Sequence, residues 1–225
     1  MRKVISTSIF ILIFVGKLFS AEPNKVTFFG SYNIGISYLP FKATIFTDNM
    51  DRYLINQLKA GVVNEFEAGV FFNSFGLGII SNLYSNNAST MVNKEDVYAS
   101  GILVSGTLTD KSRFDFVGLE LIHKKQLSNS KLDINWKIAP GVQWYYVSKN
   151  SPMENFYLKD IYTKCIFDVL LGTEINYHIS KIIDVGAGIS ILPGYYDKLT
   201  LNNHSSTKSD NVSRINTVLK LTVNL

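Results

Sequence analysis

The stretch KLDINWKIAPGVQWYYV, residues 131–147, carries the strongest fold signal in the chain. Its even positions are all apolar, and its odd positions are polar or small except for Tyr145 and Val147 at the end of the stretch, which is the period of a β-strand with one apolar face. The apolar face holds Leu132, Ile134, Trp136, Ile138, Pro140, Val142, Trp144 and Tyr146. A soluble strand usually has about 5–6 residues, whereas a strand that crosses a bilayer needs about 9–11. The length of this stretch therefore favours a membrane β-barrel.

The same alternation recurs in residues 25–38, 162–178 and 183–191. The faces opposite the apolar ones carry charges and glycines, which suits the crowded interior of a narrow barrel. Aromatic residues gather near the strand ends, as in the interfacial girdles of outer-membrane barrels. They are Phe28, Phe71, Phe72, Trp144, Tyr145, Tyr146, Tyr177, Tyr195 and Tyr196. A soluble β-sandwich also alternates, with its apolar face inward, and is the rival fold.

Residues 1–21 have the pattern of a secretory signal peptide, with a basic start and small residues before the expected cut. The apolar run from Ile9 to Val15 is interrupted soon afterwards by Lys17, so it is too short for a spanning helix of about 20 residues. We expect residues 1–21 to be removed and residues 22–225 to form one outer-membrane β-barrel domain.

Composition argues against a nucleic-acid-binding protein, a disulfide-stabilised fold and a helical membrane protein. Removal of the signal peptide lowers the net charge from +4 to +1, and no Lys/Arg-rich run is present, so no nucleic-acid partner is expected. Cys165 is the only cysteine, so no internal disulfide is expected. No second apolar run approaches 18 residues, which argues against a helical membrane protein.

The C-terminal sequence SRINTVLKLTVNL, residues 213–225, ends inside an alternating strand with Leu225 on its apolar face. This ending resembles the terminal signal of outer-membrane barrel proteins, in which the last residue is usually aromatic. The resemblance implies that the barrel-assembly machinery is a partner, together with outer-membrane lipid.

Strand number follows from parity, because single-chain bacterial barrels have an even number of strands, short periplasmic turns and longer outside loops. Nine segments have strand character: 25–38, 61–72, 75–85, 96–108, 113–123, 131–147, 160–178, 182–192 and 212–225. We assign segment 96–108 to a β segment within the outside loop 86–112, as an extension above the membrane, which leaves eight strands. The alternative is ten strands, with a missed strand in 39–60. The expected outside loops are 39–60, 86–112, 148–159 and 193–211, and the expected turns are 73–74, 124–130 and 179–181.

The chain resembles the small outer-membrane β-barrel domain families over essentially its whole mature length. The segments that carry the resemblance are FGLGI at 75–79, FVGLELIHKK at 116–125, APGVQWYY at 139–146 and LLGTEINYHIS at 170–180. These families are similar in build to OmpX and the membrane domain of OmpA. The resemblance implies an all-β, closed, antiparallel, up-and-down transmembrane barrel in the outer membrane of a Gram-negative-type bacterium.

His178 and Ser180 form a His-x-Ser pair that resembles the one in barrel lipid A deacylases, with Glu174 on the His178 face. Those enzymes place an acidic residue about a dozen positions after the histidine, and residues 190–193 contain none. A nucleophile also needs a base and an orienting carboxylate within reach. We therefore interpret the pair as part of a β-hairpin and expect no catalytic residues. A lipid A acyl-ester hydrolase is the less favoured alternative.

Charged residues recur on the faces predicted to point inward. They are Glu65, Glu67, Glu120, Asp133, Lys137, Lys164, Asp168, Glu174, Asp184, Arg214 and Lys220. Because the interior of an eight-stranded barrel is just wide enough for side chains to fill, we expect these groups to pair and plug the lumen. The alternative is that they line a narrow channel, as in a small-solute porin.

No cofactor or metal site is expected. The histidines His123, His178 and His204 and the single Cys165 lack metal-ligand spacing, and no phosphate-binding glycine loop is present. A structural or surface-interaction role through the outside loops is therefore the expected function, because loops on a rigid scaffold carry recognition. Their sequence does not specify the extracellular partner.

Overall fold

The computed structural model describes residues 26–40, 54, 57–95, 104–128, 131–153, 156–197, 199–202, 204–205 and 210–225. The expected signal peptide lies outside these residues. No helix in the described part of the chain is long and apolar enough to cross a membrane.

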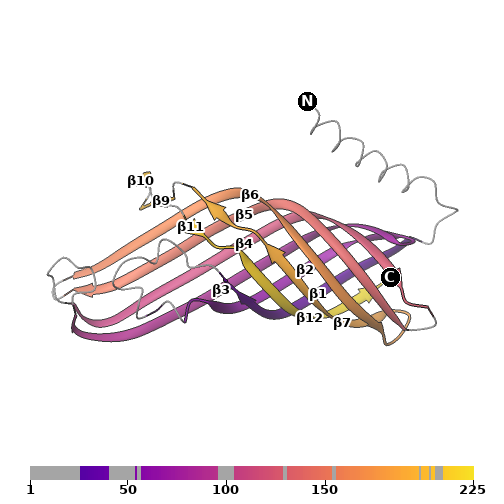
Figure 1. Cartoon of the computed structure of the whole chain (residues 1–225), viewed down its shortest axis with the longest axis horizontal. Coiled ribbons are helices and arrows are strands. Elements are labelled where there is room, and N and C mark those ends of the chain that lie inside the picture. The colour runs from indigo at the N-terminus through magenta and orange to yellow at the C-terminus, as the bar shows by residue number, and fades with distance from the viewer. Residues whose placement is uncertain are drawn as a thin grey trace, which may run out of the picture.

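Eight antiparallel strands form a closed ring, each paired with its neighbour in sequence (Figure 1). They are β1 (Val26–Tyr38), β2 (Ala60–Phe72), β3 (Phe75–Glu95), β4 (Val104–Gln126), β5 (Leu132–Met153), β6 (Phe156–His178), β7 (Ile183–Leu192) and β12 (Arg214–Asn224). Pairing of β12 with β1 closes the ring. The predicted all-β up-and-down barrel is confirmed, and the strand number is eight rather than ten.

Four two-residue strands lie in the connection from β7 to β12 and are not part of the ring. They are β8 (Tyr195–Tyr196), β9 (Thr200–Leu201), β10 (His204–Ser205) and β11 (Asp210–Asn211). β8 pairs with β11, and β9 pairs with both β10 and β6. This connection thus folds back on itself and docks on the edge of β6.

The register of the ring fixes the width of the barrel. A path across paired residues that starts in β6 returns to β6 ten residues nearer the start of that strand. The path runs through Thr173, Ile189, Thr217, Ile36, Val62, Ser85, Arg113, Tyr146 and Thr163. Eight strands with this stagger tilt by about 45° and leave an interior that side chains fill.

The outer surface of the ring is apolar. Ile36, Leu119 and Phe167 are 64%, 69% and 71% exposed, and Trp136 and Trp144 also point outward. The alternation predicted from the sequence therefore has its apolar face outside and its polar face inside, the reverse of a soluble β-sandwich. Cys165 is free and also lies exposed on the outer face.

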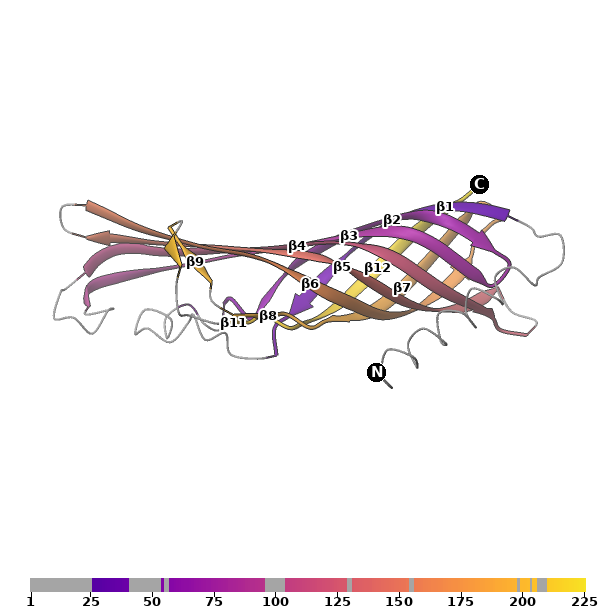
Figure 2. The same ribbon diagram turned by 90° about the horizontal axis from the view of Figure 1, so that it is seen from above.

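Strands β3 to β6 continue far beyond the other four, as Figure 2 shows. We call this continuation the extended sheet; it comprises Asn86–Glu95, Val104–Ser112, Val147–Met153 and Phe156–Tyr162. The predicted outside loops 86–112 and 148–159 are therefore wrong, because most of their residues belong to strands. Residues 104–108 of the predicted β segment 96–108 are indeed β structure and belong to β4 of the extended sheet, whereas residues 96–103 lie outside the described residues. Several inward positions of the extended sheet are polar, such as Ser112 and Lys149, and they are buried together with Ala88 and Leu108. The alternation of apolar and polar residues is therefore weaker there.

The short connections gather at the opposite end of the barrel. Asn73 and Ser74 join β2 to β3, and Asn73 has a φ of 57°, which asparagine tolerates in a tight hairpin turn. Phe28 at the start of β1 and Leu225 after β12 form two backbone hydrogen bonds with each other, so the first and last strands of the ring also meet at this end. The predicted turns are confirmed in position, although β4 extends to Gln126, so the turn after it is shorter than expected.

Candidate functional site

The middle of the lumen holds six ionisable side chains, which we call the lumen charge cluster. They are Glu65, Glu67, Glu120, Lys137, Glu174 and Lys220, and each is at most 7% exposed. They come from β2, β4, β5, β6 and β12. Successive side chains of a strand point to opposite faces of the sheet. Each of these six residues points inward because its neighbours in sequence lie on the outer face.

Two lysines hold the carboxylates together. Lys137 Nζ lies 2.9 Å from Glu65 Oε1 and 2.7 Å from Glu174 Oε1, and it also bonds Glu67. Lys220 bonds Glu67 and lies 2.7 Å from Glu174 Oε2. The two ammonium groups thus bridge Glu67 and Glu174 across the lumen, which offsets part of the cost of burying these charges.

Glu120 is the least satisfied member of the cluster. Its Oε1 lies 3.9 Å from Lys137 Nζ, and neither carboxylate oxygen accepts a hydrogen bond from a residue that the structure describes. Glu65 and Glu67 accept additional hydrogen bonds from Ser31, Asn33 and Asn82.

The carboxylate oxygens of Glu65, Glu67 and Glu174 lie within 4.8 Å of one another, which is close enough to hold a metal ion. Lys137 bonds all three of these carboxylates, however. Its ammonium group therefore already supplies the positive charge at this point.

Glycines make room for the long side chains of the cluster. A Cβ atom on Gly172 would lie 2.8 Å from Lys137 Cε, and one on Gly188 would lie 2.9 Å from Glu174 Cγ. A Cβ atom at either position would force the lysine or the glutamate side chain to shift, which agrees with the expectation that glycines on the inward faces suit a crowded lumen.

An apolar layer covers the cluster on the side of the extended sheet. It consists of Ile80, Phe116, Ala139, Leu170 and Leu192, all of which are fully buried. These five side chains offer no polar group to an ion that moves along the lumen.

An aromatic layer lies beyond the apolar one. Its rings belong to Tyr84, Phe114, Tyr145 and Tyr196, with successive ring centroids 5.0, 5.2 and 4.8 Å apart. The buried guanidinium of Arg214 lies 5.6 Å from the centroid of the Tyr84 ring and donates a hydrogen bond to Asn82. Asp168 and Lys164 lie on the inner face of β6 as predicted, but they are only partly buried.

His178 lies at the turn end of the lumen, between two carboxylates. Its Nε2 is 2.9 Å from Asp133 Oδ2, and its Nδ1 is 2.7 Å from Asp184 Oδ1. Lys124 Nζ lies 2.8 Å from Asp133, and Asn224 donates to Asp184. This network ties together the ends of β4, β5, β6, β7 and β12.

Ser180 serves the turn between β6 and β7. Its Oγ accepts hydrogen bonds from the backbone N–H groups of Ile182 and Ile183, at 3.1 and 3.0 Å. Among the described residues no hydrogen bond joins Ser180 to His178, and Glu174 is engaged by the two lysines. The structure therefore separates the three residues of the hypothetical hydrolase site.

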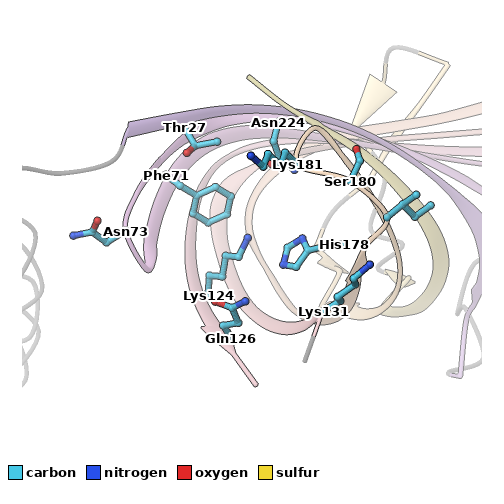
Figure 3. A pocket seen from close by; sticks show the side chains of 11 residues that line it. Thr27, Phe71, Asn73, Lys124, Gln126, Lys131, His178, Ser180, Lys181 and Asn224 are labelled. Carbon is cyan, nitrogen blue, oxygen red and sulfur yellow. The ribbon is translucent and has the colours of Figure 1, made fainter. Parts of the chain in front are cut away.

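A cavity of about 560 Å³ opens at this end of the barrel, and we call it the turn-end mouth (Figure 3). Lys124 and His178 point toward each other across it. The residues that line it are Thr27, Phe71, Asn73, Lys124, Gln126, Lys131, His178, Ile179, Ser180, Lys181 and Asn224.

No protein-family model matches the sequence, and no curated protein matches it significantly. Two solved structures are similar in fold. Neisserial surface protein A is 11% identical, with a TM-score of 0.47, over 90% of this chain and 99% of its own. A major outer membrane protein from Thermus thermophilus is 9% identical, with a TM-score of 0.54, over 89% of this chain and 100% of its own. The second likeness shows that the chain has the fold of an outer-membrane β-barrel.

Proposed function

We propose that the chain is an outer-membrane β-barrel that anchors the extended sheet outside the cell, where the sheet binds a partner. The observation that carries this proposal is the outward apolar belt of the ring, which gives way to polar outer residues such as Lys111 and Arg113 where the extended sheet begins. A continuous apolar surface of this size is unfavourable in water, whereas the hydrocarbon region of a bilayer favours it.

The extended sheet has an edge that a partner can use. Beyond Ser85, β3 pairs only with β4 among the described residues, so its other side presents unpaired backbone groups. An edge of this kind binds an extended peptide by adding it as a strand. Met91 on the outer face is 80% exposed and offers an apolar contact beside this edge.

The proposed role is non-enzymatic. His178 faces two carboxylates inside the lumen, and the Ser180 hydroxyl holds a turn. Two further proposals complete the assignment: residues 1–21 are removed as a signal peptide, and the assembly machinery of the membrane recognises β12 with Leu225 at its end.

Cysteine labelling of intact cells tests the orientation. In a Cys165→Ser background, Ser89→Cys places a thiol on the extended sheet, and Ser128→Cys places one in the turn after β4. We expect a membrane-impermeant maleimide to label Ser89→Cys in intact cells and Ser128→Cys only after permeabilisation. Labelling of Ser128→Cys alone in intact cells would contradict the proposed orientation. Recovery of the protein in the soluble periplasmic fraction would contradict the membrane assignment.

Planar-bilayer recording tests whether the lumen is closed. The charge cluster, the apolar layer and the aromatic layer each fill the interior, so we expect the purified barrel to give no stepwise conductance at about 100 mV. Stable, reproducible steps from the wild-type protein would favour the narrow-channel alternative instead.

A further inference from the structure

The turn-end mouth has a one-sided charge distribution. Every ionisable side chain that lines it is basic: Lys124, Lys131, His178 and Lys181. The nearby carboxylates of Asp133 and Asp184 are buried at 0% and 4% exposure and lie behind this surface. A ligand that enters the mouth therefore meets cations first.

Two lysines of this surface are not compensated. Asp133 is engaged by Lys124 and His178, and Asp184 is engaged by His178 and Asn224. Lys131 and Lys181 are exposed, and neither forms an ion pair with a residue that the structure describes. The mouth thus presents two ammonium groups that are available to bind an anion from outside the chain.

Neutral donors and an apolar wall complete the cavity. Ser180 Oγ already accepts two backbone hydrogen bonds, so its O–H remains to donate. Thr27 and Gln126 add a hydroxyl and an amide, and Phe71 supplies an apolar wall below the Lys124 ammonium group, 5.4 Å from its ring centroid. Donors of this kind suit oxygen anions, and the volume of about 560 Å³ falls in the range of small-molecule sites.

We propose that the turn-end mouth is a binding site for a multivalent oxyanion, which Lys131 and Lys181 hold while Ser180 and Gln126 donate hydrogen bonds to it. Lysine acts as a point charge toward phosphate and carboxylate groups, and two uncompensated lysines favour a ligand with at least two negative charges. This inference goes beyond the proposed surface role and does not depend on it, because the mouth lies at the other end of the barrel.

Titration of the full chain in zwitterionic micelles tests the site. Pyrophosphate and citrate, followed by calorimetry, represent free phosphate and free carboxylate. Phosphatidylcholine nanodiscs with and without cardiolipin, whose headgroup carries two negative charges, represent a lipid headgroup. We expect saturable binding in at least one anionic arm and a loss of about tenfold or more in affinity in Lys131→Ala/Lys181→Ala. The binding should also weaken as salt increases.

Lys125→Ala is the matched control. Lys125 is exposed and adjacent to Lys124 in sequence, but it points away from the mouth and does not line it. We expect Lys125→Ala to bind as the wild type does. Equal losses in Lys125→Ala and in the double variant would show unspecific attraction and overturn the proposal, as would the absence of saturable binding in all arms.

Discussion

Lys137→Met lowers the free energy of unfolding of the barrel by about 3–5 kcal/mol, because it leaves a buried cluster of four carboxylates with one ammonium group. Lys137 Nζ bonds Glu65, Glu67 and Glu174, so its removal leaves carboxylates on both β2 and β6 without this ion-pair partner. Methionine fills a similar volume, which limits the loss to electrostatics and hydrogen bonding. Urea unfolding in phospholipid vesicles, followed by the fluorescence of Trp136 and Trp144, measures the change.

Two variants separate this effect from a general loss of packing. Glu65→Gln in the Lys137→Met background removes one uncompensated carboxylate while keeping its shape, and we expect it to recover about 1 kcal/mol or more. Lys125→Met changes an exposed lysine and should alter stability by less than about 0.5 kcal/mol. If Lys137→Met is as stable as the wild type, the cluster does not hold the barrel together.

Leu119→Arg reduces the stability of the barrel in lipid by about 2–4 kcal/mol, the cost of an arginine near the bilayer midplane. Leu119 is 69% exposed on the outer face of β4, next in sequence to Glu120 of the lumen charge cluster. In a soluble sheet the same substitution at an exposed position would have almost no effect. Equilibrium unfolding in vesicles therefore reports on the membrane as well as on the fold.

Ser89→Arg is the control for Leu119→Arg. Ser89 is also exposed on an outer face, but it belongs to the extended sheet. We expect Ser89→Arg to remain within about 0.5 kcal/mol of the wild type. Similar costs for the two variants would contradict the assignment of the apolar belt to lipid, and so would a Leu119→Arg variant as stable as the parent chain.

The architecture of the ring could be predicted from the amino-acid sequence alone. Alternation in residues 131–147 identifies which side chains point outward, and Lys137 and Trp136 therefore lie on opposite faces as predicted. The short turns and the even strand number then lead to eight strands. Each of these inferences rests on a local period or on chain length, which a single sequence displays.

Prediction from the sequence failed where the period weakens. The parity of short and long connections predicts outside loops at 86–112 and 148–159, whereas in the structure the strand register continues through the polar residues Asn86, Ser112 and Lys149. Outside lipid, polar residues are compatible with either face of a strand, so hydrogen bonding across the sheet rather than hydropathy determines the structure there.

The pairing of the inward residues depends on the three-dimensional arrangement of the strands. Glu67 and Lys220 are 153 positions apart, and Glu65 and Lys137 are 72 apart, yet both pairs meet in the middle of the lumen. These contacts require the stagger of ten residues around the ring. If one strand slipped by two residues, its inward side chains would still point inward, but its charged groups would lie at another level of the lumen. The faces are a local property of each strand, whereas the charge cluster and the basic turn-end mouth exist only once the ring has closed.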